Sequence, residues 1–404
     1  MSALALFLAI VLLAAAIWIV VPAQNYWLLA LSIGAPELSA WLLVASGLVV
    51  LMSLPGLRRR WSARLALLGA IGSGLLAWQV LGEIGPAVTA ANRSMTESFG
   101  AAVLDTPSNS AAVTRTEPVV QSQMLVGLPA TDVRESHGVP IGTTGDVPLA
   151  LDIYQPGSRS DTPSGGAAKR PIVVQIYAGG WRDGMPGDHA AFARQYAARG
   201  YVVFAVDYRH APQWKWPAQL ADIRTALSWI KTHAGDYNAD GSRIALIGRS
   251  AGAQLALIAG MSPADPAIRA IVALYSPVNL TDGWEHVPQP DTLGVRSMLE
   301  ALIGGTPANK PDLYRDASPI SYADRPHPPV LLINGGHDRV VALAYATTLH
   351  EHLRKSGTAG LIVLPWADHA FDLVSFGPSA QMSLYYTERF LAQQMWKPIA
   401  SSSR

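Results

Sequence analysis

The sequence predicts an α/β fold with a mostly parallel central sheet, preceded by a hydrophobic transmembrane helical region. The first 85 of the 404 residues are strongly apolar. Short apolar runs recur through the rest of the chain, and segments of helical periodicity separate them. Buried strands that alternate with helices in this way form a parallel sheet covered by helices on both faces.

The composition excludes several classes of protein. The net charge is +1 and charged residues make up 15% of the chain, so no basic surface indicates a nucleic-acid partner. The absence of cysteine excludes disulfides, thiolate metal sites and cysteine nucleophiles. Apolar residues make up 50% of the chain and the mean hydropathy is +0.21, which is high for a water-soluble enzyme. This apolar excess is concentrated at the N-terminal end.

Three apolar stretches within residues 1–85 predict a membrane region with about three transmembrane helices. They cover residues 3–23, 39–55 and 63–85, and a helix needs about 20 apolar residues to cross the hydrocarbon core. Residues 26–36 are apolar but shorter, so we expect them to lie at the interface or to extend a neighbouring helix. A cleaved signal peptide is the alternative for the first stretch, but its length and the lack of Lys or Arg before it disfavour that interpretation.

Positive charges predict the orientation of these helices. The Lys and Arg side chains before residue 93 all lie between the end of the second stretch and the first residues of the third: Arg58, Arg59, Arg60 and Arg64. Cytoplasmic loops carry the excess of Lys and Arg. With three spans, the N-terminus is then cytoplasmic and the chain after the third stretch is extracytoplasmic. We therefore expect an integral protein of the cell's inner or plasma membrane.

The rest of the chain divides into a tether and one domain. Residues 86–117 are rich in Ser, Thr, Asn and Ala without a sustained apolar period, so we expect a flexible tether. Residues 118–398 are expected to form the α/β domain, with an insertion at about 277–328. Its predicted strands cover residues 172–177, 201–206, 243–248, 270–275, 329–333 and 361–364. Its predicted helices cover residues 191–198, 220–230, 251–259, 343–353 and 382–395.

One short motif marks a candidate nucleophile. Gly248-Arg249-Ser250-Ala251-Gly252 follows a predicted strand and opens a predicted helix. A serine on such a sharp turn projects its hydroxyl from the sheet edge, and the flanking glycines leave the room that the turn needs. Ser250 is therefore the candidate nucleophile. The alternative is a serine that only caps the helix beginning at Ala251.

A glycine pair follows the strand at residues 172–177. In Tyr177-Ala178-Gly179-Gly180-Trp181, the two glycines leave room for a substrate carbonyl to approach the backbone. Backbone N–H groups in such a place stabilise the oxyanion of acyl transfer. An ordinary glycine turn is the alternative interpretation.

Two further residues complete a candidate triad. A nucleophilic serine needs a base, and the base needs an acid that fixes its tautomer. Asp338 and His369 each lie just past a predicted strand, and the chain order Ser250, Asp338, His369 is the one expected for this sheet topology. His337 precedes Asp338 and Asp368 precedes His369, so a swapped pairing is the alternative. We favour Asp338 and His369 because of their positions just past the strand ends. No spacing of His and Asp residues fits a metal site, and we expect no cofactor.

Residues 138–395 resemble the α/β-hydrolase superfamily. Its nearest branches are the esterases related to hormone-sensitive lipase and the group of kynurenine formamidases and feruloyl esterases. The resemblance rests on Gly179-Gly180-Trp181, residues 207–212 (DYRHAP), 216–218 (WPA) and 314–319 (YRDASP), the Ser250 turn, and Asp338 with His369. It implies the α/β-hydrolase fold, and it implies the backbone N–H groups of Gly179, Gly180 and Ala251 as oxyanion donors.

Two positions depart from the pattern of that superfamily. Tyr177-Ala178 stands where the family usually has His-Gly, and Arg249 replaces the usual acidic or His residue before the nucleophile. Neither change removes a required atom, because the oxyanion donors are backbone groups. Both bear on the substrate that the protein prefers.

Together these residues predict a membrane-anchored serine hydrolase that cleaves carboxylic esters through an acyl-enzyme on Ser250. Its partners would be a small-molecule or lipid-like ester and, through residues 1–85, a lipid bilayer. An amidase or formamidase and an acyltransferase would use the same triad, and a non-catalytic binding protein would use the same fold.

Two tryptophans are candidate substrate-binding residues, Trp181 and Trp284. Trp284 belongs to the insertion at about 277–328, which is expected above the nucleophile because ligands bind beyond the carboxyl ends of the strands. Trp284 and a helix in the insertion would wall the acyl pocket, or would only pack the insertion onto the sheet. The apolar residues at helical spacing in that helix are Met298, Leu299, Leu302 and Ile303.

Overall fold

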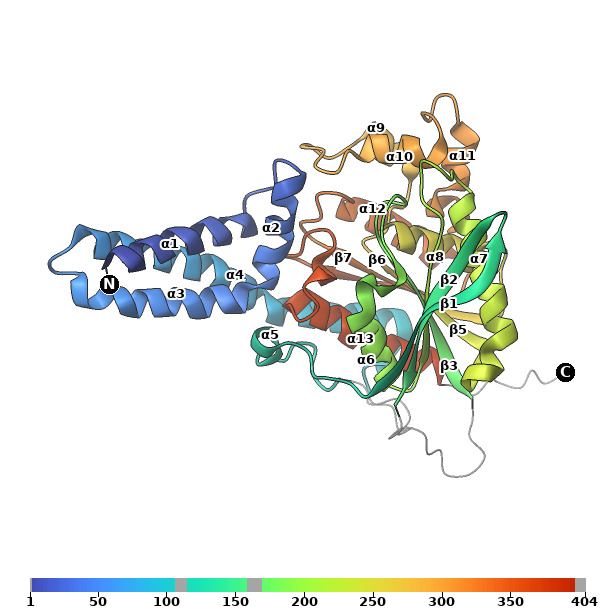
Figure 1. Ribbon diagram of the computed structural model, residues 1–404, viewed down its shortest axis with the longest axis horizontal. Helices are drawn as coiled ribbons and strands as arrows, with labels where there is room; N and C mark the ends of the chain where they lie inside the picture. The colour runs from blue at the N-terminus through green and yellow to red at the C-terminus, as the bar shows by residue number, and fades with distance from the viewer. Residues whose placement is uncertain (1, 106–114, 158–168, 397–404) are drawn as a thin grey trace.

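A computed structural model describes residues 2–105, 115–157 and 169–396 of the chain. An elongated helical bundle at the N-terminal end projects from an α/β unit formed by the rest of the chain (Figure 1). The N-terminus lies at the far tip of the bundle, and the sheet lies at the opposite end of the molecule.

Three long helices form the bundle: α1 (Ser2–Ala16, continued by the 3-10 helix η1, Ile17–Ile19), α3 (Ser39–Ser53) and α4 (Trp61–Phe99). Small side chains face one another between these helices, and Ala5, Ala9 and Ala66 are buried there. The hydroxyls of Ser46 and Ser73 share a hydrogen bond of 2.7 Å. Small residues let helix backbones approach closely, as is typical of helix pairs in lipid.

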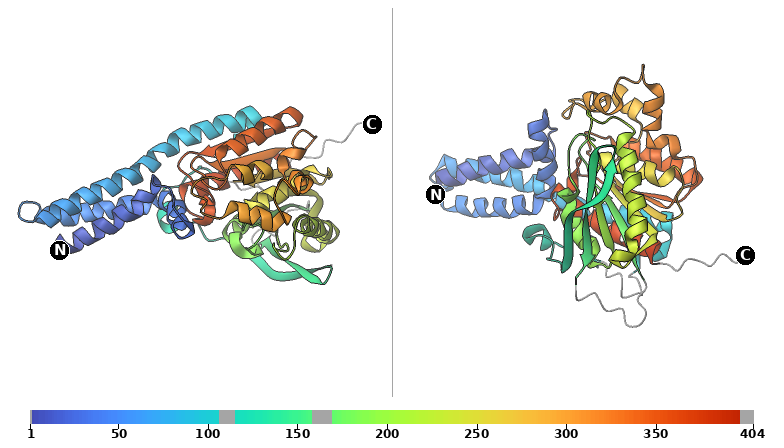
Figure 2. Two further views of the ribbon diagram at one scale, coloured as in Figure 1. Left: turned by 90° about the horizontal axis from the view of Figure 1, so that it is seen from above. Right: turned by 45° about the vertical axis from the view of Figure 1, so that its right-hand side comes forward.

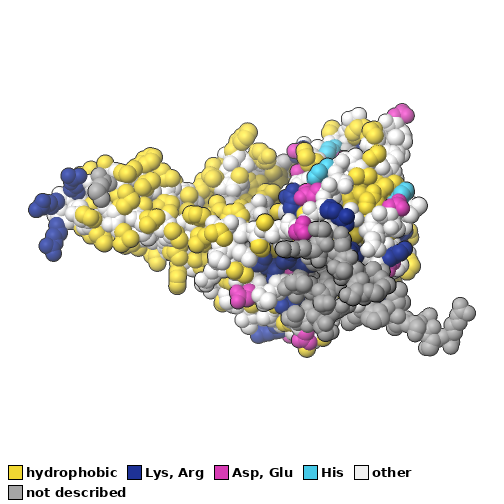
Figure 3. Space-filling model, turned by 60° about the horizontal axis from the view of Figure 1, so that its bottom comes forward, with side chains coloured by type: hydrophobic (Ala, Val, Ile, Leu, Met, Phe, Trp, Pro, Cys, Tyr) yellow, Lys and Arg dark blue, Asp and Glu magenta, His cyan; other side chains and the backbone are white. Residues whose placement is uncertain are grey.

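The outside of the bundle is apolar. Figure 3 shows hydrophobic side chains over its length and basic side chains at its far tip. All three helices, taken as Ser2–Ile19, Ser39–Gly56 and Trp61–Phe99, are long and apolar enough to cross a membrane. Arg60, in the basic loop after α3, donates a hydrogen bond to Ser2, so the N-terminal end of α1 lies on the same side as that loop.

The apolar stretch between the first two long helices is a separate helix, α2 (Tyr26–Glu37), which runs across the end of the bundle next to the α/β unit (Figure 1). The side chain of Asn25 caps it by accepting from the N–H of Leu28. Two polar side chains of α2 reach the α/β unit. Ser32 donates to Asp368 at 3.1 Å, and the carboxyl of Glu37 accepts from the N–H and the hydroxyl of Ser379.

The segment expected to be a flexible tether is a helix in its first part. Helix α4 continues past Pro86 to Phe99 and lies along the α/β unit beside strand β8 (Ala359–Leu364) and helix α13 (Pro378–Met395) (Figure 2). Buried residues recur every fourth position: Ala87, Ala91 and Met95. The sequence did not predict the contact of α4 with the α/β unit, because alanine contributes little to an apolar periodicity. Alanine nevertheless lets a helix pack closely against its neighbours. Residues 106–114 of the expected tether lie outside the described residues.

One eight-stranded sheet organises the α/β unit, in the order β1-β2-β4-β3-β5-β6-β7-β8. Strands β3 to β8 pair in parallel, whereas β1 and β2 pair antiparallel at one edge. This sheet confirms the predicted α/β fold. The bounds are β1 (Val133–Thr144), β2 (Val147–Pro156), β3 (Arg170–Ile176), β4 (Val202–Val206), β5 (Ala239–Arg249), β6 (Ile268–Leu274), β7 (Val330–Gly335) and β8 (Ala359–Leu364).

Helices cover both faces of the sheet, as the nearly continuous apolar strands require. Helices α7 (Ala218–His233), α8 (Ala251–Met261) and α12 (Leu343–Ser356) contribute to one core, to which alternate residues of β3 such as Ile172 and Val174 point. On the other face, α6 (Ala190–Ala198) and α13 contribute to a second core with Val173. The short helix α5 (Gln123–Val126) precedes β1.

The insertion between β6 and β7 carries three short helices: α9 (Leu280–Glu285), α10 (Val295–Ile303) and α11 (Pro311–Asp316). They project beyond the sheet at the top of Figure 1. The remaining described elements are the 3-10 helices η2 (Leu54–Gly56), η3 (Ala101–Leu104), η5 (Pro186–His189), η6 (Ala234–Tyr237), η7 (Pro319–Tyr322) and η8 (Phe371–Leu373).

The contact of Glu37 with Ser379 predicts a pH-dependent stability. Burial raises the pKa of Glu37 from 4.5 to about 8, even though the hydrogen bonds from Ser379 lower it. The folded protein therefore holds a proton here that the unfolded chain releases above pH 4.5, and stability falls as pH rises from there toward 8. Glutamine cannot ionise, so Glu37→Gln should flatten the decline of the melting temperature between pH 5 and 8, measured in detergent micelles. The same change at exposed Glu351 should leave that slope as it is, and equal slopes for all three proteins would contradict the assignment.

Candidate active site

Ser250 lies on the turn between β5 and α8. Its backbone has φ 50° and ψ −119°, a left-handed conformation that is strained for any residue with a side chain. The two glycines of the motif make the turn possible. A Cβ at Gly248 would overlap the backbone of Gly252, and a Cβ at Gly252 would overlap the carbonyl of Tyr177. The sequence thus places the serine hydroxyl at the carboxyl edge of the sheet, as predicted for such a turn.

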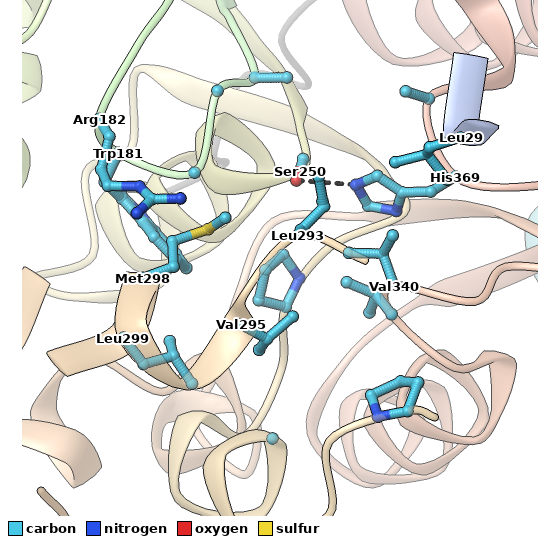
Figure 4. Close-up of a pocket in the computed structure, with 18 of the residues that line it drawn as sticks. Leu29, Trp181, Arg182, Ser250, Leu293, Val295, Met298, Leu299, Val340 and His369 are labelled. Atoms are coloured by element: carbon cyan, nitrogen blue, oxygen red, sulfur yellow. Dashed lines mark hydrogen bonds between the residues drawn. The ribbon is translucent and has the colours of Figure 1, made fainter. Parts of the chain in front are cut away.

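The structure brings Ser250, His369 and Asp338 into one chain of hydrogen bonds (Figure 4 shows the first of them). The Oγ of Ser250 lies 3.0 Å from Nε2 of His369, and Nδ1 of His369 lies 2.9 Å from Oδ2 of Asp338. The other carboxylate oxygen of Asp338 accepts from the backbone N–H groups of Val340 and Val341. These bonds fix the carboxylate, which in turn orients the imidazole.

The surroundings of His369 favour its protonated form. Burial of the imidazole opposes protonation, but the charge of Asp338 and the hydrogen bond to it outweigh burial and raise the pKa of His369 above 6.5. Asp368 and Asp372 add to this effect. An imidazole of this kind is a stronger base once it is neutral, and the imidazolium that forms by proton transfer is stabilised.

The alternative pairing does not form. Asp368 accepts from the backbone N–H groups of His369 and Arg339 and from the hydroxyl of Ser32, so its carboxylate is directed away from the imidazole. The side chain of His337 is exposed. Asp368 therefore belongs to the support of the loop that carries His369, and its link to Ser32 of α2 was not foreseen.

The glycine pair lies opposite Ser250. Gly179 and Gly180 have φ of 123° and 57°, and a Cβ at Gly179 would overlap the carbonyl of Asp183. Ala251 is the first residue of α8. Within the described part of the chain, no acceptor is found for the backbone N–H groups of these three residues. They are therefore available to a ligand oxygen, as the resemblance implies.

Tyr177 holds the base of this glycine loop. Its hydroxyl donates to the carboxylate of Asp207 at 2.6 Å and lies 2.8 Å from Nε2 of His210. Its ring stacks on Tyr208, with centroids 4.4 Å apart. At the point of departure from His-Gly, Tyr177 thus anchors the loop through its hydroxyl and its ring. Trp181 follows with its ring buried and its N–H bonded to Gln254.

Arg249, the second departure, lies under the site. The side chain is fully buried and its Nε donates to Asp372, which also accepts from the hydroxyl of Tyr275. The guanidinium lies 4.6 Å from the ring centroid of Phe192. Burial, and after it the Arg249 charge, lower the pKa of His189 to about 3, so this neighbour stays neutral. The ion pair of Arg249 and Asp372 links the residue before Ser250 to the loop after His369. The ring of Tyr275 lies beside the imidazole of His369, with ring centroids 4.7 Å apart.

A cavity of about 460 Å³ opens in front of Ser250 and His369. Apart from the residues around Ser250 it is mainly apolar, and Figure 4 shows side chains from three parts of the chain around it. Met298 and Leu299 come from α10, Val340 follows β7, and Leu29 comes from α2. Residues of the insertion thus lie in front of Ser250, whereas the share of α2 in the cavity was not predicted.

Comparison with known proteins decides the family. A family model described as BD-FAE matches residues 151–353, half of the chain. The chain belongs to the BD-FAE family. Esterase LipC of Mycobacterium tuberculosis is 31% identical over 256 residues, 58% of this chain and 61% of the relative. The probable carboxylic ester hydrolase LipM of the same organism is 30% identical over 262 residues, 60% of this chain and 58% of the relative. The matched part thus spans about three fifths of the length of these relatives.

Solved structures show the same fold. An esterase of Pyrobaculum calidifontis superposes with a TM-score of 0.56 at 20% identity, covering 76% of this chain and 92% of that one. A truncated carbohydrate esterase from gut microbiota superposes with a TM-score of 0.53 at 22% identity, covering 66% of this chain and 98% of that one. At these identities the likeness establishes the α/β-hydrolase fold of this BD-FAE protein and nothing further.

Trp284 does not line the cavity, which corrects the expectation for this residue. Its indole N–H donates to Glu300 at 2.9 Å, Arg296 lies over its ring, and the ring packs against the core below the insertion. The bond to Glu300 turns the ring toward α10 and away from the cavity. The neighbouring Gly283 lines the cavity instead, and Trp181 does so as expected.

The structure indicates no metal centre in the part of the BD-FAE chain that it describes. No group of three or more His, Cys, Asp or Glu side chains within residues 2–105, 115–157 and 169–396 is arranged to hold a metal ion. His369 and Asp338, the nearest candidates, already bind each other.

Breaking the buried ion pair should destabilise the protein. Asp372→Asn would leave the Arg249 cation buried without a counter-charge, which costs about 3–5 kcal/mol of unfolding free energy. Asp265→Asn is the matched control, because its pair with Lys231 is partly exposed and such pairs contribute about 0–1 kcal/mol. Denaturant unfolding in micelles measures both. Equal losses in the two variants would contradict the role assigned to the buried pair.

Proposed function

We propose that the protein is a serine hydrolase that cleaves carboxylic esters through an acyl-enzyme on Ser250. The observation that carries the proposal is the hydrogen-bonded chain of Ser250, His369 and Asp338 at the mouth of an apolar cavity. The names of the relatives, an esterase and a probable carboxylic ester hydrolase, favour esters over amides. The intact triad favours an enzyme over a binding protein on the same fold.

The geometry supports a two-step reaction. Neutral His369 takes the proton of the Ser250 hydroxyl as the oxygen attacks the acyl carbon, and Asp338 stabilises the imidazolium that forms. The N–H groups of Gly179, Gly180 and Ala251 would then stabilise the negative oxygen of the tetrahedral intermediate. His369 returns the proton to the leaving alcohol. Water, activated by the same imidazole, then attacks the acyl-enzyme and releases the acid.

We further propose that α1, α3 and α4 anchor the enzyme in the cell's inner or plasma membrane. Their length and apolar surface support spanning, and the Arg58 to Arg64 cluster supports a cytoplasmic position for the loop before α4. Because Arg60 bonds to Ser2, the N-terminus shares that side. The α/β unit then lies on the extracytoplasmic side.

Replacement of the nucleophile tests the mechanism. Ser250→Ala should lower kcat for p-nitrophenyl butyrate by about 10⁴-fold or more, because loss of a triad member removes the covalent path. It should also abolish labelling by a fluorophosphonate. Ser276→Ala is the control, since that hydroxyl donates only to its neighbour Pro277 among the described residues. A Ser250→Ala enzyme with near-parental turnover would refute the assignment.

Reporter fusions test the orientation. Alkaline phosphatase folds only outside the cytoplasm, so a fusion after Ala101 should be active and a fusion after Arg59 inactive, when both are expressed in a bacterial host. A fluorescent protein that folds only in the cytoplasm should give the opposite result at the same two points. Activity of both phosphatase fusions, or of neither, would contradict the three-span topology.

A further inference from the structure

Helix α2 forms one wall of the cavity in front of Ser250. Five of its residues line that cavity: Tyr26, Trp27, Leu29, Ala30 and Ile33. They lie far outside residues 151–353, which match the family model. The wall therefore comes from the apolar N-terminal region, and Figure 4 shows Leu29 beside His369.

The position of α2 along the chain places it at the boundary of the bilayer. The first candidate span ends at Ile19, six residues before the asparagine that caps α2, and the second begins at Ser39, two residues after α2 ends. A helix tied this closely to two proposed spans at the same end of the bundle is expected at the membrane surface. Trp and Tyr side chains concentrate at that level.

The rim of the cavity is apolar where it meets this boundary. Trp27 is 82% exposed and Tyr26 is 60% exposed, although both line the cavity. Across from them, Leu373 of η8 lines the cavity and is 63% exposed. Apolar side chains are also exposed on α1, on η1 and directly after η1: Leu13, Ile17 and Val20. Apolar side chains of α2 and η8 therefore form this part of the rim.

The wall is fixed to the loop that carries the candidate base. Ser32 donates to Asp368, the residue before His369, and Glu37 binds Ser379. These bonds hold the position of the cavity constant with respect to the membrane helices. These contacts therefore fix the mouth of the cavity relative to the helices that we propose to span the membrane.

From this arrangement, and on the basis of the esterase activity proposed above, we infer that the substrate is a long-chain ester dissolved in the bilayer. Its acyl chain passes from the lipid over Trp27 and Tyr26 into the apolar cavity, and its carbonyl reaches Ser250. A route through water would disfavour each methylene by roughly fourfold in partition. The direct route avoids that step, because the chain moves from one apolar environment to another.

Surface dilution tests the route without any mutation. The full chain is reconstituted in phosphatidylcholine vesicles, and hydrolysis of 4-methylumbelliferyl oleate is followed. The amount of phosphatidylcholine in the protein-containing vesicles is raised, while the amounts of protein and of ester are held constant. The rate should fall in proportion to the mole fraction of ester in the bilayer. With 4-methylumbelliferyl acetate, which is water-soluble and has the same leaving group, the rate should follow the bulk concentration. An oleate rate that ignores the mole fraction would overturn the inference.

A matched pair of variants tests the wall. Trp27→Glu places a charge on the rim and should lower the ratio of the oleate rate to the acetate rate by about tenfold, the effect expected when one large apolar side chain is lost from the path. Trp61→Glu makes the same change at a tryptophan that is also exposed, at the start of α4 beside the basic loop. The ratio for Trp61→Glu should stay within about twofold of the parent. An unchanged ratio for Trp27→Glu, or equal losses in both variants, would overturn the inference.

Failure of the esterase itself gives a different result. Rates are counted per Ser250 labelled by a fluorophosphonate. A protein that is neither labelled nor active on the acetate ester refutes the proposed function, and the inference with it. A protein that is labelled and cleaves the acetate, but shows no dependence on the bilayer for the oleate, retains the esterase function and refutes only the lipid route.

Discussion

The left-handed turn at Ser250 is the constraint on which the rest of the site depends. The chain must leave β5 and enter α8 with a serine at φ 50°, and glycines at 248 and 252 make this possible. The turn places the hydroxyl at the carboxyl edge of the sheet. Because β7 and β8 run parallel to β5, the residues that follow them reach the same edge. Asp338 and His369 therefore meet Ser250 although they are distant in sequence.

A buried ion pair fixes the loop that carries Ser250 relative to the loop that carries His369. Arg249 precedes the serine, and Asp372 follows the histidine by three residues, so their bond joins the loops that carry both. A buried pair gains little net stability over apolar packing, but removal of one partner is costly. Tyr275 adds a hydroxyl to the carboxylate and a ring against His369. The pair thus restricts the relative position of the two loops, as the proposed roles of Ser250 and His369 require.

Much of this arrangement was predictable from the sequence, because local patterns determine it. Continuous apolar runs marked the parallel strands, and the glycines around Ser250 marked the turn. Pairs that no local motif marks were not predictable: Arg249 with Asp372 is an example, since 123 residues separate them and Asp372 lies in no recognisable motif. The sequence left a cavity wall and simple packing open for Trp284, and the bond of its indole to Glu300 with the packing of its ring on the core decides for packing. The second half of α4 was missed because an alanine stripe packs closely without a strong apolar period.

The contribution of α2 shows why the helical bundle and the α/β unit form one structure. A flexible tether would let the α/β unit move independently of the bundle, but α4 packs along β8 and α13 as far as Phe99. Helix α2 then supplies a wall that the family match does not include, with Leu29 and Ile33 in the cavity. Without that helix the cavity would open to solvent beside His369, and an apolar surface would be exposed to water. The N-terminal helices therefore complete the space in front of Ser250, and the contacts of α2 and α4 fix the position of that space relative to the helical bundle.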